Sequence, residues 1–146
     1  MVTHDIKPSI YEIGLDKDLA NHVPLSPISF LRRSAEIYPA KTAIIYDDYQ
    51  ISYENFYARC CNLAQALQNI GIGIGDTVAV MAPNVPAMLE CHYGVPMTGA
   101  VLNTVNIRLD AATISFVLRH SEAKIFLVDR EYGSVVKEAL EDLEIK

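Results

Sequence analysis

Hydrophobic positions along this chain recur with two different periods, one helical and one extended. Apolar side chains at positions 56, 60, 63, 67 and 70 follow one another at steps of four and three, as on one face of an α-helix. Ser52 offers a capping hydroxyl before this stripe, and Gly71 offers a left-handed stop after it. We therefore predict a helix between these two residues.

The segment before this helix predicts a shorter helix and a hairpin. Ser26-Pro27 is a typical helix start, and Tyr38-Pro39 a typical stop, with Phe30, Leu31, Ser34 and Ala35 along the helix between them. Residues 42–46 and 49–53 flank the turn pair Asp47-Asp48, which favours an antiparallel hairpin. Residues 1–25 show no clear period, so we predict an N-terminal arm there and a folded part over 26–146.

Three glycines at positions 71, 73 and 75 stand directly before the apolar run 77–82. A glycine-rich phosphate loop follows a strand and opens a helix, so that free N–H groups point at the anion. Here the order is reversed, because the glycines follow a helix and precede a strand. We interpret them as a turn in which glycine supplies positive φ.

The second half of the chain alternates strands with helices. Strands are predicted at 77–82, 100–105 and 125–128. Between and after them we predict three helices: one capped by Asn84 and ended or kinked by Pro96, one capped by Asp110, and one with apolar positions from 132 to 143. This order predicts an α/β fold, a β-hairpin followed by parallel βαβ units. Parallel sheets bind ligands outside the carboxyl ends of their strands, here near residues 83–84, 104–106 and 129–130.

Composition and charge exclude several classes of partner. The chain has 146 residues with 12 basic and 18 acidic side chains, a formal charge of −6. No basic run is present, so we expect no nucleic-acid partner. No apolar stretch approaches the ~20 residues of a transmembrane segment, and the charged N-terminus is unlike a secretory signal. The three cysteines, Cys60, Cys61 and Cys91, fit neither a disulfide framework nor a metal site, so we expect reduced, buried thiols.

Residues 38–129, together with "PLSPISFLRRSAEIYP" at 24–39, resemble the N-terminal part of the acyl-adenylate-forming (AMP-binding) family. The segment "GDTVAVMAPNVPAMLECHYGVPMTGAVLNTVNIRLD", residues 75–110, is most similar to its acyl-CoA synthetases and plant-type acyl-activating enzymes. The resemblance covers about nine-tenths of the chain but only about the first quarter of a family member. It implies that residues 26–146 are an incomplete AMP-dependent synthetase/ligase domain.

The resemblance implies a two-step reaction in the full-length parent. ATP converts a carboxylic acid to an acyl-adenylate, and the thiol of CoA then takes the acyl group, with Mg²⁺ as cofactor. The expected phosphate loop, rich in Ser, Thr and Gly and ending in Lys, is not found here. None of the lysines follows such a cluster; they are Lys7, Lys17, Lys41, Lys124, Lys137 and Lys146. We therefore expect this chain to be an inactive fragment of a ligase for short- or medium-chain fatty acids or aromatic acids, with no catalytic residue of its own.

Arg108 is the candidate binding residue. It lies in the predicted loop Asn106–Leu109 after a strand, where a guanidinium can pair with phosphate. In some family members the arginine of a similar loop contacts the nucleotide phosphates of CoA, so the resemblance implies that contact here. The alternative is an ion pair with Asp110 or another nearby carboxylate.

Other candidate residues have structural interpretations. Asn84 and Asn106 serve as caps or turn formers. Cys91 and His92 are adjacent on a helix and diverge by ~100°, so they cannot act as nucleophile and base, and we expect His92 to be packed. Packing also explains the five aromatic positions Tyr46, Tyr49, Tyr53, Tyr57 and Tyr93 better than base stacking does.

Two other functions remain open from the sequence. One is a complete, non-catalytic α/β binding or regulatory module, and the other is a flavin- or nicotinamide-binding domain, against which the missing strand-then-glycine fingerprint argues. We expect a cytoplasmic location. A peroxisomal one is the alternative for a plant protein, because the usual peroxisomal address is C-terminal.

Overall fold

The computed structural model describes residues 14, 16, 18, 20, 22, 23, 25–141, 143 and 145. The elements run α1 (Pro27–Ile37), β1 (Thr42–Tyr46), β2 (Tyr49–Ser52), α2 (Tyr53–Asn69), β3 (Thr77–Met81), α3 (Pro86–Met97), β4 (Val101–Thr104), α4 (Ala111–His120), β5 (Ala123–Val128), the 3₁₀ turn η1 (Arg130–Tyr132) and α5 (Gly133–Ala139). Most of the predicted arm at 1–25 lies outside the described residues, so the arm stays a prediction.

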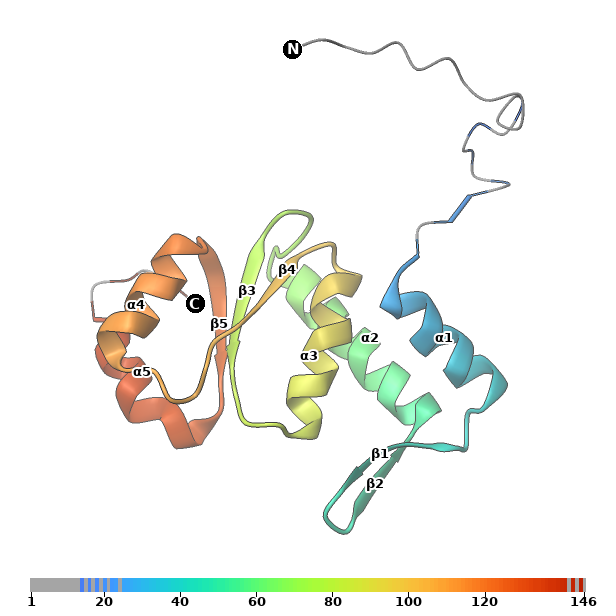
Figure 1. The fold of residues 1–146 in the computed structure, drawn as a ribbon, viewed down its shortest axis with the longest axis horizontal. Coiled ribbons are helices and arrows are strands. Elements are labelled where there is room, and N and C mark those ends of the chain that lie inside the picture. Colours follow the sequence, from blue (N-terminus) through green and yellow to red (C-terminus); the bar gives the residue numbers. More distant parts are fainter. Residues whose placement is uncertain are drawn as a thin grey trace.

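A three-stranded parallel sheet in the order β4-β3-β5 forms the centre of the fold. The helices α2 and α3 cover one face, and α4 and α5 cover the other (Figure 1). Along β3 the side chains alternate between these two cores: Val78 and Val80 pack toward α2 and α3, while Ala79 and Met81 pack toward α4 and α5. All four are buried, as expected of a central parallel strand. The predicted α/β class and the predicted parallel units are confirmed.

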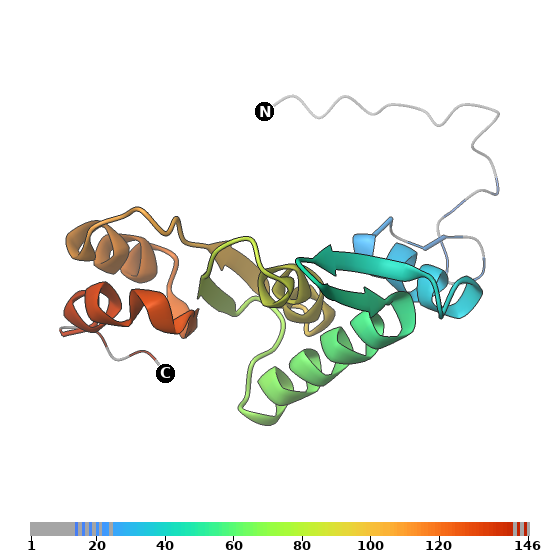
Figure 2. The same ribbon diagram turned by 90° about the horizontal axis from the view of Figure 1, so that it is seen from below.

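The antiparallel hairpin β1–β2 stands apart from this sheet, over α1 and α2 (Figure 2). The turn residue Asp47 adopts a left-handed φ of 49°, which aspartate tolerates better than most residues. Beneath the hairpin a small core gathers Leu31, Ile51, Phe56 and Cys60. The rings of Phe56 on α2 and Tyr93 on α3 meet edge to face, with centroids 5.4 Å apart. This contact joins the hairpin core to α3.

Local capping explains where the helices begin. The side chains of Ser26, Ser52 and Asp110 each accept a hydrogen bond from a backbone N–H of the helix that follows, as the sequence predicts. Gly71 follows the end of α2 with φ 89°, and the segment 71–76 is a helix-to-strand turn. The prediction of a turn in place of a phosphate loop is therefore confirmed. Pro96 lies one residue before the end of α3. It therefore stands at the end of the helix, as predicted, and does not interrupt the helix interior.

Several predicted details are wrong. Asn84 does not cap α3, because the helix begins at Pro86 and the capping position falls on Val85, which has no capping side chain. Ile70, the last position of the predicted apolar stripe, is exposed, since α2 buries a narrower stripe than the sequence suggests. The last helix is shorter than predicted: α5 ends at Ala139, after a 3₁₀ turn that accommodates Arg130–Tyr132.

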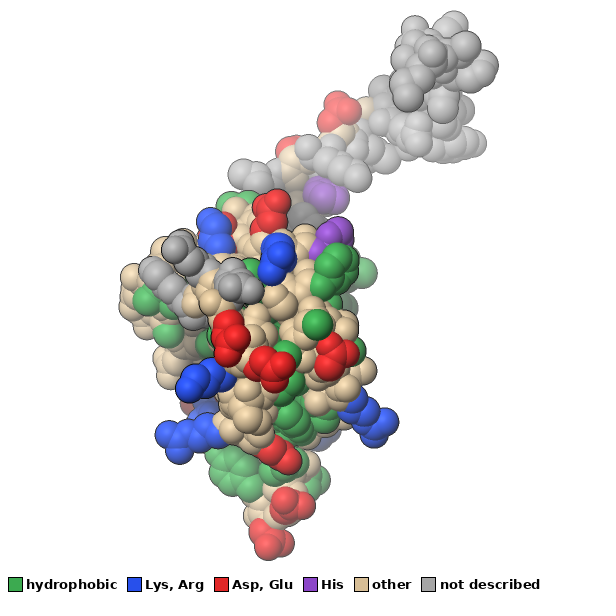
Figure 3. Space-filling model, turned by 90° about the vertical axis from the view of Figure 1, so that its left-hand side faces the viewer, with side chains coloured by type: hydrophobic (Ala, Val, Ile, Leu, Met, Phe, Trp, Pro, Cys, Tyr) green, Lys and Arg blue, Asp and Glu red, His purple; other side chains and the backbone are tan. Residues whose placement is uncertain are grey.

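Polar side chains of both signs lie on the end of the molecule formed by α4 and α5. Figure 3 views this end and shows acidic and basic side chains interspersed over its surface. Of the helices that the structure describes, none combines the length and the apolar character needed to cross a bilayer.

Candidate functional site

The carboxyl ends of β3 and β4 border a shallow hollow of about 420 Å³, here called the polar hollow. Its polar groups come from Asn84 after β3, from Thr104 and Asn106 at the end of β4, and from His92 on α3. The predicted ligand-binding edge of the sheet therefore forms an open depression with hydrogen-bonding groups around it. Asp129 and Arg130, at the end of β5, do not line it and border a separate hollow beside α3.

The loop after β4 is held by its own asparagine. Asn106 Oδ1 accepts a hydrogen bond from the backbone N–H of Arg108 at 2.9 Å, and the Asn106 carbonyl accepts one from the N–H of Leu109 at 3.3 Å. Asn106 is therefore a turn former, as predicted. No hydrogen bond between described residues involves the NH₂ group of Asn106, which is therefore available as a donor.

The side chain of Arg108 is exposed. The predicted alternative, an ion pair with Asp110, is not formed: Asp110 accepts hydrogen bonds from the N–H and the hydroxyl of Thr113 at 2.9 and 3.0 Å. These bonds hold the pKa of Asp110 below its ordinary value. Among the ion pairs between described residues, none involves Arg108. Its guanidinium therefore remains accessible to an anion.

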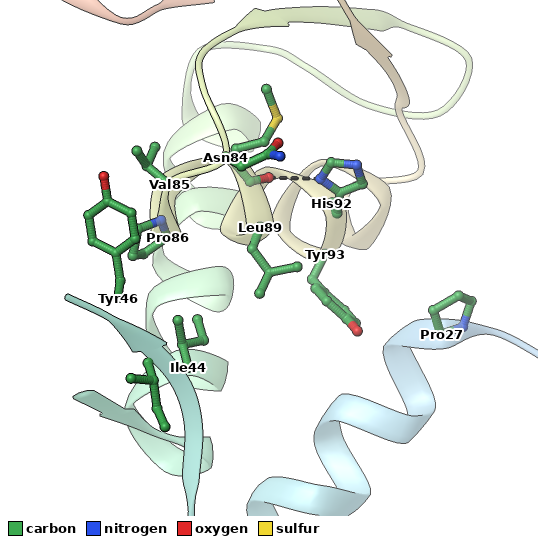
Figure 4. A pocket seen from close by; sticks show the side chains of 11 residues that line it. Pro27, Ile44, Tyr46, Asn84, Val85, Pro86, Leu89, His92 and Tyr93 are labelled. Atoms are coloured by element: carbon green, nitrogen blue, oxygen red, sulfur yellow. Dashed lines mark hydrogen bonds between the residues drawn. The ribbon is translucent and has the colours of Figure 1, made fainter. Parts of the chain in front are cut away.

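His92 lies on the exposed side of α3. Its Nδ1 lies 2.8 Å from the carbonyl oxygen of Met88, one turn earlier, and since a carbonyl only accepts, Nδ1 carries the proton and donates (Figure 4). Nε2 is then the ring nitrogen left for another partner. The prediction that His92 is packed is wrong, because the first half of α3 turns this position toward solvent at the rim of the sheet.

Cys91 is buried on the opposite side of the same helix, so Cys91 and His92 are not paired, as predicted. Burial raises the pKa of the Cys91 thiol to about 11 and that of Cys60 to about 12. Both thiols are free and unreactive at neutral pH. The third cysteine, Cys61, is half-buried, which departs from the predicted burial.

A second depression of about 550 Å³, here called the apolar groove, lies between the hairpin and α3. Three consecutive residues of β1 form one wall, and the N-terminal half of α3 forms the other, with Pro27 of α1 at one end (Figure 4). Ile45 on β1 is 71% exposed and Leu89 on α3 is 40% exposed. Tyr46 also lines the groove and is exposed, as is Tyr49, so the predicted packing of the tyrosines holds for Tyr53, Tyr57 and Tyr93 alone.

Sequence reasoning missed a buried charge behind this surface. Glu90 on α3 is 7% exposed, and its two carboxylate oxygens accept hydrogen bonds from Arg59 on α2 at 2.5 and 3.2 Å. The pair raises the pKa of Arg59. The sequence contains one signal for this ion pair, which is that Glu90 stands within a strongly apolar helix, where a charge needs a partner.

Comparison with known proteins finds one family and many CoA ligases. A sequence model of the family "AMP-binding enzyme" matches residues 31–146. Over 121 residues the chain is 52% identical to the peroxisomal butyrate–CoA ligase of Arabidopsis thaliana, covering 83% of this chain and 21% of that protein. Over 127 residues it is 50% identical to the peroxisomal trans-cinnamate:CoA ligase of Petunia hybrida, covering 87% and 22%.

The fold matches solved structures of the same kind. A putative long-chain-fatty-acid CoA ligase from Rhodopseudomonas palustris superposes with a TM-score of 0.77 at 31% identity, over 82% of this chain and 30% of that one. The benzoate CoA ligase from Burkholderia xenovorans gives a TM-score of 0.76 at 25% identity, over 82% and 24%. The chain spans about a fifth of the length of the curated relatives that it matches.

Proposed function

Because the chain belongs to the AMP-binding enzyme family, we propose that it forms part of a carboxylate–CoA ligase. The observation that carries this proposal is identity near 50% to several plant ligases, named for butyrate, trans-cinnamate and benzoate, along most of the chain. The proposed full-length enzyme joins a short- or medium-chain fatty acid or an aromatic acid to CoA, with ATP and Mg²⁺ as co-substrate and cofactor.

The described residues do not fit the phosphates of ATP or their metal ion. They contain no group of three or more His, Cys, Asp or Glu side chains able to hold a metal. The glycine segment 71–75 follows a helix and so presents no helix N-terminus to an anion. We therefore assign no step of the reaction to a residue of this chain, and we expect residues 1–146 alone to be inactive.

We also propose that Arg108 contacts a phosphate of CoA. Support comes from its exposed guanidinium, its place in a loop at the carboxyl end of β4, and the engagement of the neighbouring Asp110 with Thr113. A guanidinium binds phosphate through paired N–H groups that a lysine cannot reproduce.

We propose a cytoplasmic location, with the peroxisome as the alternative. The alternative draws support from the relatives in Arabidopsis thaliana and Petunia hybrida whose names include "peroxisomal". Fluorescence microscopy of the full-length protein in its own cells, with the tag at the N-terminus so that a C-terminal signal stays free, distinguishes the two.

The test of the function is acid-dependent turnover by the full-length protein. Acetate, butyrate, benzoate and trans-cinnamate are each incubated with ATP, Mg²⁺ and CoA, and AMP and acyl-CoA are measured. We expect equal amounts of both products with at least one acid, and neither product from residues 1–146. A full-length protein that forms neither with any acid contradicts the proposal, and acyl-CoA formation by residues 1–146 contradicts the expected inactivity.

A further inference from the structure

The outer side of α1 carries large apolar side chains in contact with water. The helix buries Leu31 and Ala35 on its inner side. Figure 1 shows α1 at the end of the molecule opposite α4 and α5. Before, on and after this helix, four large apolar side chains are each more than half exposed: Leu25, Phe30, Ile37 and Tyr38.

Basic side chains are concentrated on the same segment. Residues 23–41 contain three of the 12 basic residues of the chain but only one of its 18 acidic residues. That acidic residue, Glu36, pairs with Arg32 at 3.7 Å. Arg33 and Lys41 are exposed, and among the ion pairs between described residues none involves either of them. The segment is therefore positive in a chain that is negative as a whole.

The cations stand beside the exposed apolar side chains. Arg33 lies three residues after Phe30 and four before Ile37, so these three positions share one side of the helix. Lys41 Nζ lies over the ring of Tyr38, 5.6 Å from its centroid. Together these side chains form what is here called the α1 surface, made of Leu25, Phe30, Arg33, Ile37, Tyr38 and Lys41.

The chemistry of the α1 surface selects a lipid bilayer among large partners. An apolar stripe flanked by Arg and Lys is typical of helices that lie in a membrane interface, where tyrosine occupies the level of the headgroups. None of the six side chains lines the polar hollow or the apolar groove, so the surface offers no pocket of the kind that anchors a protein partner. A second copy would bring Arg33 and Lys41 close to like charges.

We propose that the α1 surface binds peripherally to membranes that contain anionic lipid, with Arg33 and Lys41 at the headgroups and with Phe30 and Ile37 at the boundary of the acyl chains. One short helix supplies few apolar side chains, so this binding is reversible. The proposal goes beyond the proposed function and does not depend on it, because it requires no acid, ATP or CoA.

Binding is measured by flotation of the full-length protein with vesicles. We expect flotation with phosphatidylcholine vesicles that contain about 30% phosphatidylserine, and little with phosphatidylcholine alone. Raising the salt from about 0.1 M to about 0.5 M should reduce flotation, because it screens the headgroup charge. Equal flotation with both vesicles, or none with either, overturns the proposal.

Variants locate the binding surface. Arg33→Ala and Lys41→Ala are each expected to weaken binding to the anionic vesicles about fivefold. Phe30→Ala is expected to weaken it about tenfold, and its exposure means that the change removes little packing from the fold. Phe116→Ala and Arg119→Ala on α4 are the matched controls, because Phe116 is 65% exposed and Arg119 is exposed. Unchanged binding in all three α1 variants, or equal losses in the controls, overturns the proposal.

Access to the α1 surface in the whole protein is tested by alkylation. In the variant Phe30→Cys, the introduced thiol is expected to be alkylated in the absence of lipid and protected by the anionic vesicles, as read by peptide mass spectrometry. A thiol that stays unlabelled without lipid means that another part of the protein covers this surface, and the proposal fails. Protection by polyglutamate equal to that by vesicles indicates an acidic protein as the partner and also overturns it.

Acyl-CoA formation is assayed on the same variants with butyrate, a water-soluble acid. It should be unchanged, because no residue of the α1 surface lines the candidate site. Vesicle binding without turnover leaves this inference standing, whereas turnover without vesicle binding leaves only the proposed function standing.

Discussion

Arg59 on α2 and Glu90 on α3 form a two-pronged ion pair across the interface of the two helices that cover one face of the sheet. Arg59 is half-exposed whereas Glu90 is almost fully buried. The guanidinium therefore pairs with a carboxylate that would otherwise be buried among apolar side chains. The pair joins α2 to α3, the helix whose Met88, Leu89 and His92 line the candidate site.

Removing Arg59 is expected to destabilise this interface more than removing both charges. Arg59→Met leaves the Glu90 carboxylate buried without a partner and should cost about 1–3 kcal/mol. Arg59→Met with Glu90→Leu should cost less than the sum of the single changes. Amide hydrogen exchange of α2 and α3 in the full-length protein measures the loss. The exposed pair Arg32–Glu36 is the control, and its removal should cost at most about 0.5 kcal/mol.

Gly94 is expected to tolerate no larger side chain. A Cβ at this position of α3 would lie 2.8 Å from Leu63 Cδ2 and 3.0 Å from the Cys60 carbonyl oxygen, both on α2. Gly94→Ala should therefore push the helices apart and cost about 1–3 kcal/mol. Gly133→Ala is the control. Gly133 is the first residue of α5, and a Cβ there would meet no other atom, so the change should be neutral or mildly stabilising. Thermal unfolding compares the two, and equal melting temperatures contradict the close packing.

Asp76 should make the start of the sheet sensitive to acid. Its carboxylate pairs with Lys124 of β5 at 2.5 Å and accepts the Gly73 N–H at 2.9 Å, and these partners, Lys124 foremost, lower its pKa. Because the folded pKa lies below the ordinary value of 3.8, the stabilisation is complete above that value. It disappears as the pH falls through the lowered pKa.

The variant Asp76→Asn should be less stable than the parent at pH 7 and should lose less stability between pH 5 and pH 3. Unfolding by urea across that range measures both effects. Asp48→Asn, in the hairpin turn, is the matched control and should leave the acid dependence unchanged. An unaltered acid profile in Asp76→Asn means that other carboxylates control it.

Sequence reasoning succeeded where the structure depends on neighbouring residues and failed where it depends on distant ones. The caps Ser26, Ser52 and Asp110 act on the next turn of chain, so local pattern finds them. The predicted cap at Asn84 is wrong by one position, because a capping residue must stand directly before the helix and Val85 occupies that place. The partner of Glu90 lies 31 residues away, and no periodicity encodes it.

In the candidate site, too, the features set by neighbouring residues could be predicted and those set by distant residues could not. Its place at the carboxyl ends of the strands follows from the parallel order, which the sequence predicts. The apolar groove does not follow, because it arises where β1 of the hairpin stands beside α3, and the core of Leu31, Ile51 and Phe56 beneath the hairpin joins residues that are far apart in the sequence. Ile45 and Tyr46 were predicted as ordinary hairpin residues, and the fold leaves them exposed at the groove.

The three thiols should react at very different rates. Burial raises the pKa of Cys60 to about 12 and that of Cys91 to about 11. At pH 8 about one Cys60 thiol in ten thousand and about one Cys91 thiol in a thousand are therefore ionised, and burial also makes both thiols poorly accessible. Cys61 is half-buried and should be alkylated first. Peptide mass spectrometry after iodoacetamide treatment measures the order. In urea all three should react alike, and rapid native labelling of Cys60 or Cys91 contradicts their burial.

Arg108→Ala tests the proposed contact with CoA. If the guanidinium binds a phosphate of CoA, its loss should raise the KM for CoA about 10- to 100-fold in the full-length protein. The acid-dependent exchange of pyrophosphate into ATP requires no CoA and should be unchanged. Arg108→Lys should recover part of the affinity, since a lysine keeps the charge but not the paired N–H groups.

Arg119→Ala is the matched control, because Arg119 is an exposed arginine on α4 whose guanidinium donates a hydrogen bond to Ser115 at 3.3 Å. An effect on pyrophosphate exchange equal to that on CoA utilisation means that Arg108 supports the fold of the loop rather than a phosphate.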